Sequence, residues 1–326
     1  MRLTIGSRGS ALALWQANWV RDRLVILRHA AEIKIIQTSG DRDDRARSDA
    51  AGASGVKGLF IKELEEALIE GTIDVAVHSL KDLPLDQPPG LTIAAISERE
   101  DARDALVCRE GVIPAGTGFS ALPGGARVAT GSLRRQAQLR HLRPDLRYVP
   151  IRGNVDTRLR KLDAGECEAL ILAKAGLLRL GVEGRISETF SPEYLCPAPG
   201  QGALGIETRS DGRLEGASVE RAAAALDDRM TRYAVRAERT VIWSLNGDCS
   251  TPVGAYAEAS GERLNLVAVV ASPDGSRLIG ANASGPLTKP EDLGNRVAED
   301  LVSQGAREIL DSLATGHSPA LEPAGA

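Results

Sequence analysis

The chain has 326 residues, a length that suggests two or three domains rather than one core. Apolar residues make up 43% and charged residues 26%, which is typical of a folded globular protein and excludes a disordered chain. No apolar run approaches the ~18 residues that cross a bilayer, and the N-terminus lacks the pattern of a signal peptide. We therefore expect a cytoplasmic protein without a membrane partner.

The basic residues are biased toward arginine. Seven of the 40 basic residues are lysine, so 33 are arginine, in a chain of formal net charge −4. The segment from Arg127 to Lys161 contains ten basic residues and two acidic ones. The planar guanidinium matches carboxylates and phosphates, whereas 3% aromatic residues leave little for stacking on bases. The composition predicts a small multivalent anion as the ligand rather than nucleic acid.

The cysteines and histidines do not form a metal-binding pattern. The four cysteines have no C-x-x-C spacing and the four histidines are scattered, so we expect neither a disulfide framework nor a metal centre. Cys108 and Cys167 lie beside apolar positions and are interpreted as small core residues. Cys249 lies in a predicted loop of Gly, Asp and Ser, where a thiol is accessible, which makes it a candidate nucleophile or attachment point, with a free spectator thiol about equally favoured.

The first hundred residues alternate between predicted strands and helices. Ser10 is placed to cap a helix in which Leu12, Trp15 and Trp19 have helical spacing. The stretch 39–58 lacks apolar periodicity and predicts a mobile loop. The other predicted elements are strands at 2–6, 32–38, 73–77 and 91–96 and a helix at 59–70. Such alternation predicts a parallel sheet with helices on both faces.

A second α/β unit and an α+β unit follow. The second unit has predicted strands at 127–130, 146–150 and 169–172 and helices at 132–141 and 155–164. The Pro- and Gly-rich run 196–205 predicts a crossing between domains. Beyond it we predict helices at 217–226, 230–244 and about 290–312, strands at 252–258, 263–271 and 276–283, and a tail. The expected fold class is two hinged doubly wound α/β domains that resemble type II periplasmic binding proteins, plus a C-terminal α+β domain, with a ligand in the cleft.

One strand-to-helix turn of the second unit has the pattern of an anion site. The sequence T-G-S-L-R-R (130–135) brings Ser132, Arg134 and Arg135 to a helix start, where backbone N–H groups and the positive end of the helix attract anions. The alternative is an ordinary helix start with solvated arginines. Two adjacent arginines in the first turn favour the anion site.

Two further turns repeat this pattern more weakly. In I-R-G-N-V-D-T-R-L (151–159), Arg152 and Arg158 are equally well explained as arginines near a glycine turn and on a helix surface. In S-R-G-S, Arg8 and Ser10 lie at the first turn of the chain, and a simple helix cap is the better single explanation for Ser10. The two turns of the second unit, 130–135 and 151–159, together favour an anion-binding function.

The end of the strand at 73–77 carries an acidic candidate. Lys81 and Asp82 follow this buried strand, and chemistry in open α/β sheets concentrates at the carboxyl ends of strands. An aspartate before Leu-Pro is more often a turn residue, so the pattern alone favours a turn. His78 is interpreted as a core histidine with a hydrogen-bond partner.

These segments together resemble the porphobilinogen deaminase (hydroxymethylbilane synthase) family. The similarity runs in order over about the first 310 residues and rests on eight motifs. They are S-R-G-S-A-L-A-L-W-Q-A (7–17), G-V-K-G-L-F-I-K-E-L-E (55–65), D-V-A-V-H-S-L-K-D-L-P (74–84), E-R-E-D-A-R-D-A (98–105), S-L-R-R-Q (132–136), R-G-N-V-D-T-R-L (152–159), G-Q-G-A-L-G-I-E (200–207) and the loop around Cys249.

The resemblance implies an enzyme that joins four porphobilinogen molecules head to tail, releases four ammonias and hydrolyses off hydroxymethylbilane. It implies a dipyrromethane primer bound covalently to Cys249 and a catalytic Asp82, which with Lys81, Ser132, Arg134 and Arg135 also binds the cofactor. The implied substrate-binding residues are Arg8, Ser10, Gln16, Arg152, Arg158, Arg179, Lys57 and Lys62. The implied domains are 1–99 with 200–220, 100–199, and 221–326.

The chain departs from the family pattern at Gly9, Gly131, Asp156 and Asp248. The first two could weaken anion contacts slightly. Asp248 is the more consequential departure, because a carboxylate beside Cys249 is expected to raise the thiol pKa and to repel the carboxylates of the primer.

The sequence disfavours two alternatives to this enzyme, a non-catalytic anion-binding protein and a relative without catalysis. A hinged anion-binding protein for transport or transcriptional sensing would need a signal peptide or a DNA-binding domain, and neither is evident in the sequence. A relative that has lost catalysis would not need to retain Lys81, Asp82 and Cys249, which are all present. No apolar helix stripe favours an oligomer, so we expect a monomer.

Overall fold

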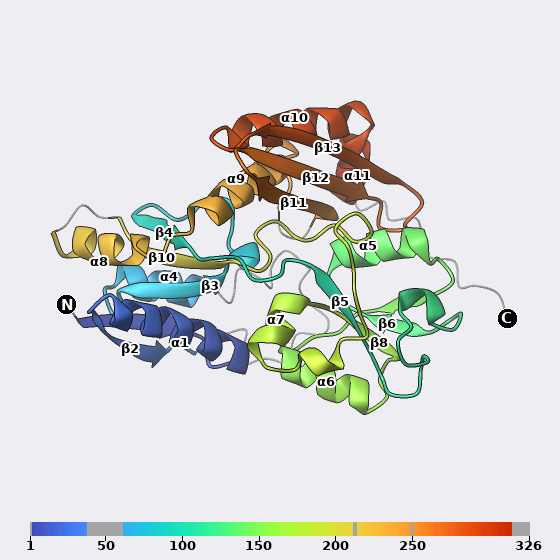
Figure 1. Ribbon diagram of the computed structural model, residues 1–326, viewed down its shortest axis with the longest axis horizontal. Helices are drawn as coiled ribbons and strands as arrows, with labels where there is room; N and C mark the ends of the chain where they lie inside the picture. The colour runs from blue at the N-terminus through green and yellow to red at the C-terminus, as the bar shows by residue number, and fades with distance from the viewer. Residues whose placement is uncertain (1, 38–60, 211–213, 249–250, 315–326) are drawn as a thin grey trace.

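The structure is a computed structural model that describes residues 2–37, 61–210, 214–248 and 251–314. It contains three sheets, each in a different unit of the chain (Figure 1). The loop predicted at 39–58, Lys57 and Cys249 lie outside the described residues. Within the described ranges, no helix combines the length and the apolar character that a bilayer crossing requires.

The first sheet has the strand order β2-β1-β3-β10-β4. Its strands are β1 (Arg2–Ser7), β2 (Ala30–Ile35), β3 (Val75–Ser79), β4 (Leu91–Ile96) and β10 (Leu204–Arg209). Strands β1, β2 and β3 are parallel, but β10 is antiparallel to both β3 and β4, with Ile206 opposite Val77. The expectation of a parallel sheet is therefore wrong for this part of the sheet, because β10, which returns from the second unit, lies antiparallel between β3 and β4.

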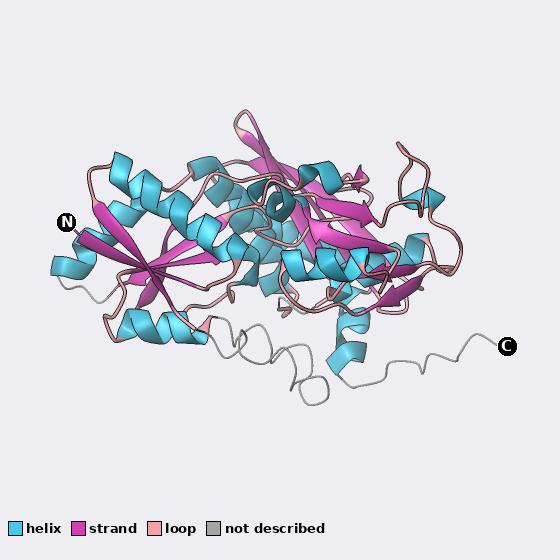
Figure 2. Cartoon of the chain, turned by 90° about the horizontal axis from the view of Figure 1, so that it is seen from below, coloured by secondary structure: helices cyan, strands magenta, loops and turns pink. Residues whose placement is uncertain are grey.

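Helices cover both faces of the first sheet (Figure 2). They are α1 (Ala11–Ile26), α4 (Lys62–Ile69) and α8 (Leu214–Ala224). Val20 and Leu24 of α1 pack with Leu3 and Ile5 in one apolar cluster, while Leu68 of α4 belongs to another. Ser10 caps α1 as predicted, since its Oγ accepts from the Ala13 backbone N–H at 3.3 Å. The doubly wound arrangement is confirmed for this unit.

The second sheet has the order β7-β6-β8-β5-β9. Its strands are β5 (Asp104–Cys108), β6 (Arg127–Ala129), β7 (Arg147–Val149), β8 (Ala169–Ala173) and β9 (Glu188–Thr189). Its helices are α5 (Leu133–Leu142), α6 (Val155–Asp163) and α7 (Lys174–Arg179), with short 3-10 turns η2 (Phe119–Ala121) and η3 (Glu183–Arg185). Strand β5 is antiparallel to β8 and β9, so this sheet is also mixed. The sequence analysis missed β5, β9, β10 and α7.

The third unit is an antiparallel sheet covered by helices (Figure 1). Its elements are α9 (Arg229–Ser244), β11 (Val253–Ser260), β12 (Arg263–Ala271), β13 (Leu278–Pro286), α10 (Pro290–Ser303) and α11 (Ala306–Ala314). The prediction of a single helix at about 290–312 is wrong, because the helix is interrupted near Gly305 and two helices form. This glycine has a φ of +96°, a left-handed conformation that ends α10 and lets α11 begin in a new direction.

Two segments join the first and second units, and they lie backbone against backbone. The Glu100 backbone N–H donates to the Gly202 carbonyl at 3.2 Å. Gly202 has a φ of +94°, and a Cβ at this position would lie 2.2 Å from the Glu100 carbonyl oxygen. Only glycine fits here, because the backbone would have to move to admit a side chain.

Gly202→Ala is therefore expected to lower the free energy of unfolding by about 1–3 kcal/mol more than Gly125→Ala. Gly125 is the matched control, since its φ is +76° but a Cβ there would meet nothing within 4 Å. The control isolates the cost of the left-handed conformation, about 1–2 kcal/mol. Urea denaturation of both variants tests this, and equal losses would contradict the close approach.

Candidate active site

Asp82 lies just beyond the carboxyl end of the central strand β3. The chain leaves β3 at Ser79 and forms a short 3-10 turn, η1 (Leu80–Asp82). Leu80 is fully buried, and its backbone N–H donates to the Ala203 carbonyl at 3.0 Å. Burial of Leu80 anchors the turn, so that Lys81 and the half-buried Asp82 are held at the sheet edge where chemistry is expected.

Helix α1 brings the first turn of the chain to the same edge. The Gln16 side chain is buried, and its Nε2 donates to Ser79 Oγ at 2.9 Å. Ser10 is occupied as the helix cap, and Arg8 is half-buried next to it. The predicted residues Ser10 and Gln16 thus lie on one helix whose N-terminal half runs beside the end of β3.

The arginines at the start of α5 are buried on a carboxylate. Arg134 and Arg135 are 5% and 6% exposed and share the fully buried Asp104, which begins β5. Arg134 Nη2 donates to Asp104 Oδ2 at 2.8 Å and Arg135 Nη2 to Oδ1 at 2.7 Å. The interpretation of these residues as solvated surface arginines is wrong. Ser132 caps α5, since its Oγ accepts from the Arg135 backbone N–H at 3.5 Å.

Gln201 connects this buried cluster to Lys81. Its Nε2 donates to Asp104 Oδ1 at 2.8 Å and to the Ala102 carbonyl at 2.6 Å. Its Oε1 accepts from Lys81 Nζ at 3.1 Å and from Arg135 Nη2 at 3.5 Å. The side chain is 1% exposed, so these bonds form a continuous buried network between the first and second units.

Arg158 shows that Asp82 and the second unit meet. Its Nε donates to the Gly153 carbonyl at 2.7 Å. Burial, with the charges of Arg135 and Arg152, lowers the pKa of Arg158 to about 10, and the charge of Asp82 partly opposes this lowering. Asp82 therefore lies within electrostatic range of Arg158, which is itself within range of Arg135 and Arg152. Three arginines thus lie near one another around Arg158, an arrangement that suits a polyanion.

Arg179 contacts one of the two segments that join the first and second units. It ends α7, is buried, and donates from Nη2 to the Gly202 carbonyl at 2.6 Å. Its guanidinium carbon lies 5.5 Å from the ring centroid of Trp15 on α1. The Arg179 side chain therefore connects the second unit, to which α7 belongs, with Trp15 of the first unit.

Three predicted residues are not brought to this cluster by the described contacts. Lys62 begins α4, where its side chain is 70% exposed and lies 3.6 Å from Glu66. Lys57 and Cys249 are outside the described residues. Of the departures from the family pattern, Gly131 is the tightest, since a Cβ there would lie 3.0 Å from the Ile151 carbonyl oxygen. A serine at this position would force a small shift of that backbone.

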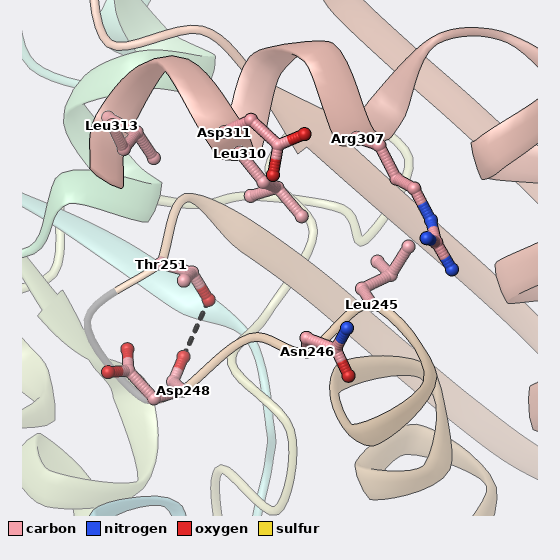
Figure 3. A pocket seen from close by; sticks show the side chains of 8 residues that line it. All are labelled: Leu245, Asn246, Asp248, Thr251, Arg307, Leu310, Asp311 and Leu313. Atoms are coloured by element: carbon pink, nitrogen blue, oxygen red, sulfur yellow. Dashed lines mark hydrogen bonds between the residues drawn. The ribbon is translucent and has the colours of Figure 1, made fainter. Parts of the chain in front are cut away.

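The turn that leads to Cys249 is fixed by the end of α9. Asn246 has a φ of +54°, and the Gly247 N–H donates to the Ile242 carbonyl at 3.0 Å, which closes the helix. Beyond the cysteine, Thr251 Oγ1 donates to the Asp248 carbonyl at 2.6 Å (Figure 3). The described residues on either side of positions 249–250, Asp248 and Thr251, are thus joined by a hydrogen bond.

A cavity of about 420 Å³ adjoins this turn. Asp248 and Thr251 line it on one side, and Arg307 and Asp311 of α11 on the other (Figure 3). All its lining residues belong to the third unit, and none is a predicted site residue. The cavity is therefore separate from the edge of the first sheet that carries Asp82.

The residues present fit an anionic cofactor. Arg134 uses two of its N–H donors in described bonds, and Arg158 uses only Nε. For Arg152, no side-chain hydrogen bond is found within the described part of the chain, and its side chain is exposed. Arginines with unused donors suit the carboxylates of a dipyrromethane.

Sequence analysis assigned no role to Asp104 or Gln201, although both lie in the motifs that carry the family resemblance. His78 was predicted correctly. It is 6% exposed, and its Nε2 lies 3.0 Å from Glu207 Oε2. Cys167 is buried as predicted, while Cys108 is only half-buried.

Comparisons with known proteins agree with these features. Residues 3–215 match the family model "Porphobilinogen deaminase, dipyromethane cofactor binding domain" and residues 232–303 match "Porphobilinogen deaminase, C-terminal domain". The porphobilinogen deaminase of Pelobacter propionicus is 47% identical over 314 residues, which cover 96% of this chain and 97% of that protein. That of Thiobacillus denitrificans is 48% identical over 311 residues, covering 95% and 98%.

Among solved structures, the methionine-binding protein MetQ aligns with a TM-score of 0.41 and 13% identity over 69% of this chain and 89% of that one. The two family models together cover most of the chain, and the relatives align over nearly its whole length. The chain therefore belongs to the porphobilinogen deaminase family, a family of transferases with a dipyrromethane cofactor.

Proposed function

We propose that Asp82 is the catalytic residue of this porphobilinogen deaminase and that Cys249 carries its dipyrromethane primer. The observation that carries the proposal is that Asp82, just beyond the end of β3, lies within electrostatic range of Arg158, which comes from a different α/β unit and is itself near Arg135 and Arg152. An acidic group beside a cluster of arginines suits a substrate with a reactive amine and several carboxylates.

The role of Asp82 is to donate protons to the substrate and to accept them from it. It assists the departure of the aminomethyl nitrogen of porphobilinogen as ammonia, and the electrons of the broken C–N bond leave with the nitrogen. The ionised carboxylate then stabilises the positive charge left on the pyrrole and accepts or relays the pyrrole proton when the new bond forms. When bound, the dipyrromethane supplies the pyrrole carbon to which the substrate is joined.

The basic and polar residues bind carboxylates. Each pyrrole carries an acetate and a propionate, so a chain of six rings brings about a dozen negative charges into the site. The proposed contacts to the cofactor are Lys81, Ser132, Arg134 and Arg135. Those to the substrate are Arg8, Ser10, Gln16, Arg152, Arg158, Arg179, Lys57 and Lys62. We expect Asp104 to hold Arg134 and Arg135 in position for this role.

The three sheets support the division of the chain into 1–99 with 200–220, 100–199, and 221–326. The return of β10 into the first sheet explains why the first domain is discontinuous. A monomer in the cytoplasm, without nucleic acid as a partner, completes the proposal.

The intact mass of the purified protein tests the proposal. We expect a mass excess equal to one dipyrromethane that is absent from Cys249→Ala, because the thioether needs this sulfur. Ser at the same position is a second control that keeps the size of the side chain. If the wild-type protein has no excess mass and gains none on incubation with porphobilinogen, the proposed activity and attachment are both wrong.

A further inference from the structure

Helices α1 and α7 belong to different α/β units and approach each other closely (Figure 1). Gly176 of α7 faces Leu12 of α1, since a Cβ at position 176 would lie 3.6 Å from Leu12 Cδ2, an ordinary van der Waals distance. One turn further along each helix, the guanidinium carbon of Arg179 lies 5.5 Å from the ring centroid of Trp15. An aromatic ring of the first unit therefore covers an arginine of the second.

Arg179 is buried without a counter-ion in contact. It is 9% exposed, and in the described part of the chain no carboxylate lies within ion-pair distance of it. Its Nη2 donates to the Gly202 carbonyl at 2.6 Å, but its buried Nε has no hydrogen-bond partner among the described residues. Burial lowers its pKa to about 10, partly opposed by Glu100, so the side chain stays charged at neutral pH.

The indole face stabilises this charge without accepting a hydrogen bond. A cation over an aromatic ring is attracted to the π electrons, and the effect grows when water is excluded. A carboxylate in the place of the ring would occupy the N–H donors of Arg179, whereas the ring leaves them available. Trp15 is itself 36% exposed, so the contact lies at the boundary of buried and accessible space.

We propose that Trp15 is a positioning residue for substrate binding, which holds the Arg179 guanidinium so that a carboxylate of porphobilinogen can bind to it. This inference rests on the proposed function. It adds a residue outside the set of polar contacts and assigns it an effect on binding rather than on the chemical step.

The test compares steady-state kinetics of variants whose primer content has been confirmed by intact mass. Trp15→Leu is expected to raise KM for porphobilinogen about tenfold and to leave kcat within about twofold. Trp15→Phe retains an aromatic face and is expected to restore KM to within about threefold of wild type. Trp15→Met is a second non-aromatic variant for use if Trp15→Leu does not fold.

Trp19→Leu is the matched control. Trp19 lies one turn further along α1, and its ring is 5.1 Å from the guanidinium carbon of Arg23 rather than Arg179. We expect this variant to have the KM of wild type, even if its melting temperature falls. A KM rise equal to that of Trp15→Leu would show a general effect of α1 packing and overturn the inference.

A double-mutant cycle separates positioning from packing. In an Arg179→Gln background, Trp15→Leu should raise KM no further, because the residue it acts through is gone. The same rise in both backgrounds, or an unchanged KM in Trp15→Leu, overturns the role of Trp15. Neither result affects the proposed function, which instead fails if wild-type protein consumes no porphobilinogen.

Discussion

Asp82→Asn is expected to give a folded protein that retains its primer but has a kcat about 10²–10⁴-fold lower. The amide has nearly the shape of the carboxylate, so the 3-10 turn anchored by Leu80 should persist. The amide can neither donate a proton to the departing nitrogen nor balance a positive charge on the pyrrole. KM should change much less than kcat, since the arginines that bind the carboxylates remain.

Asp86→Asn serves as the control for Asp82→Asn. Asp86 lies four residues further along the same segment, with an exposed side chain. Removal of its charge should leave kcat unchanged, which shows that the effect at position 82 is local. Primer content by intact mass and unfolding by circular dichroism complete the comparison. Full activity in a primer-loaded Asp82→Asn protein would refute the assignment of Asp82.

Elements with a strong local signal could be predicted from the sequence. The strands at 91–96 and 263–271 have the predicted bounds, because apolar residues there form compact runs between turn residues. Ser10 caps α1 because a capping hydroxyl acts over only three residues. The boundary between α10 and α11 could also have been predicted from Gly305, since a glycine inside a long helical pattern can mark the end of a helix.

The buried hydrogen-bond partners within the candidate site could not be predicted from such local patterns. The sequence shows Arg134 and Arg135 at a helix start, which favours solvent or a ligand as their partner. Their actual partner, Asp104, is about thirty residues earlier and is brought to them by the antiparallel pairing of β5 with β8. Gln201 is 97 residues from Asp104 along the chain, and only β10, which enters the first sheet from the second unit, brings it there.

Asp104→Asn is expected to destabilise the protein more than any surface charge change. Asp104 accepts hydrogen bonds from Arg134, Arg135 and Gln201 in a fully buried position. Loss of its charge leaves two buried guanidinium groups without a counter-ion. Breaking a buried ion pair in this way typically costs about 3–5 kcal/mol, a large part of the ~5–15 kcal/mol by which a domain is stable.

Asp145→Asn is the control, because Asp145 is also paired with an arginine, Arg143, but at the surface. Its removal should change the free energy of unfolding far less. Urea denaturation at pH 7 compares the two variants. Equal losses in both would mean that the buried carboxylate contributes no more than an exposed one, contrary to the network seen around Asp104.

The pH dependence gives a second, independent test of Asp104. Burial raises the pKa of Asp104, but Arg134 and Arg135 outweigh it, so the pKa lies below the usual range of an aspartate. A carboxyl whose pKa is lowered by folding stabilises the protein fully above its unfolded pKa of about 3.9. That stabilisation is lost as the pH falls through the lower folded pKa.

The stability difference between wild type and Asp104→Asn should therefore be constant from pH 7 to about pH 5 and shrink below about pH 4. Below that pH the Asp104 carboxyl of the unfolded chain binds a proton while that of the folded protein is still ionised, which stabilises the unfolded state of the wild-type protein and reduces its advantage over the neutral amide. Denaturation curves of both proteins at a series of pH values measure this difference directly. A difference that grew on acidification would contradict the charge pairing, because it would mean that the ionised carboxylate is the less stable form in the folded protein.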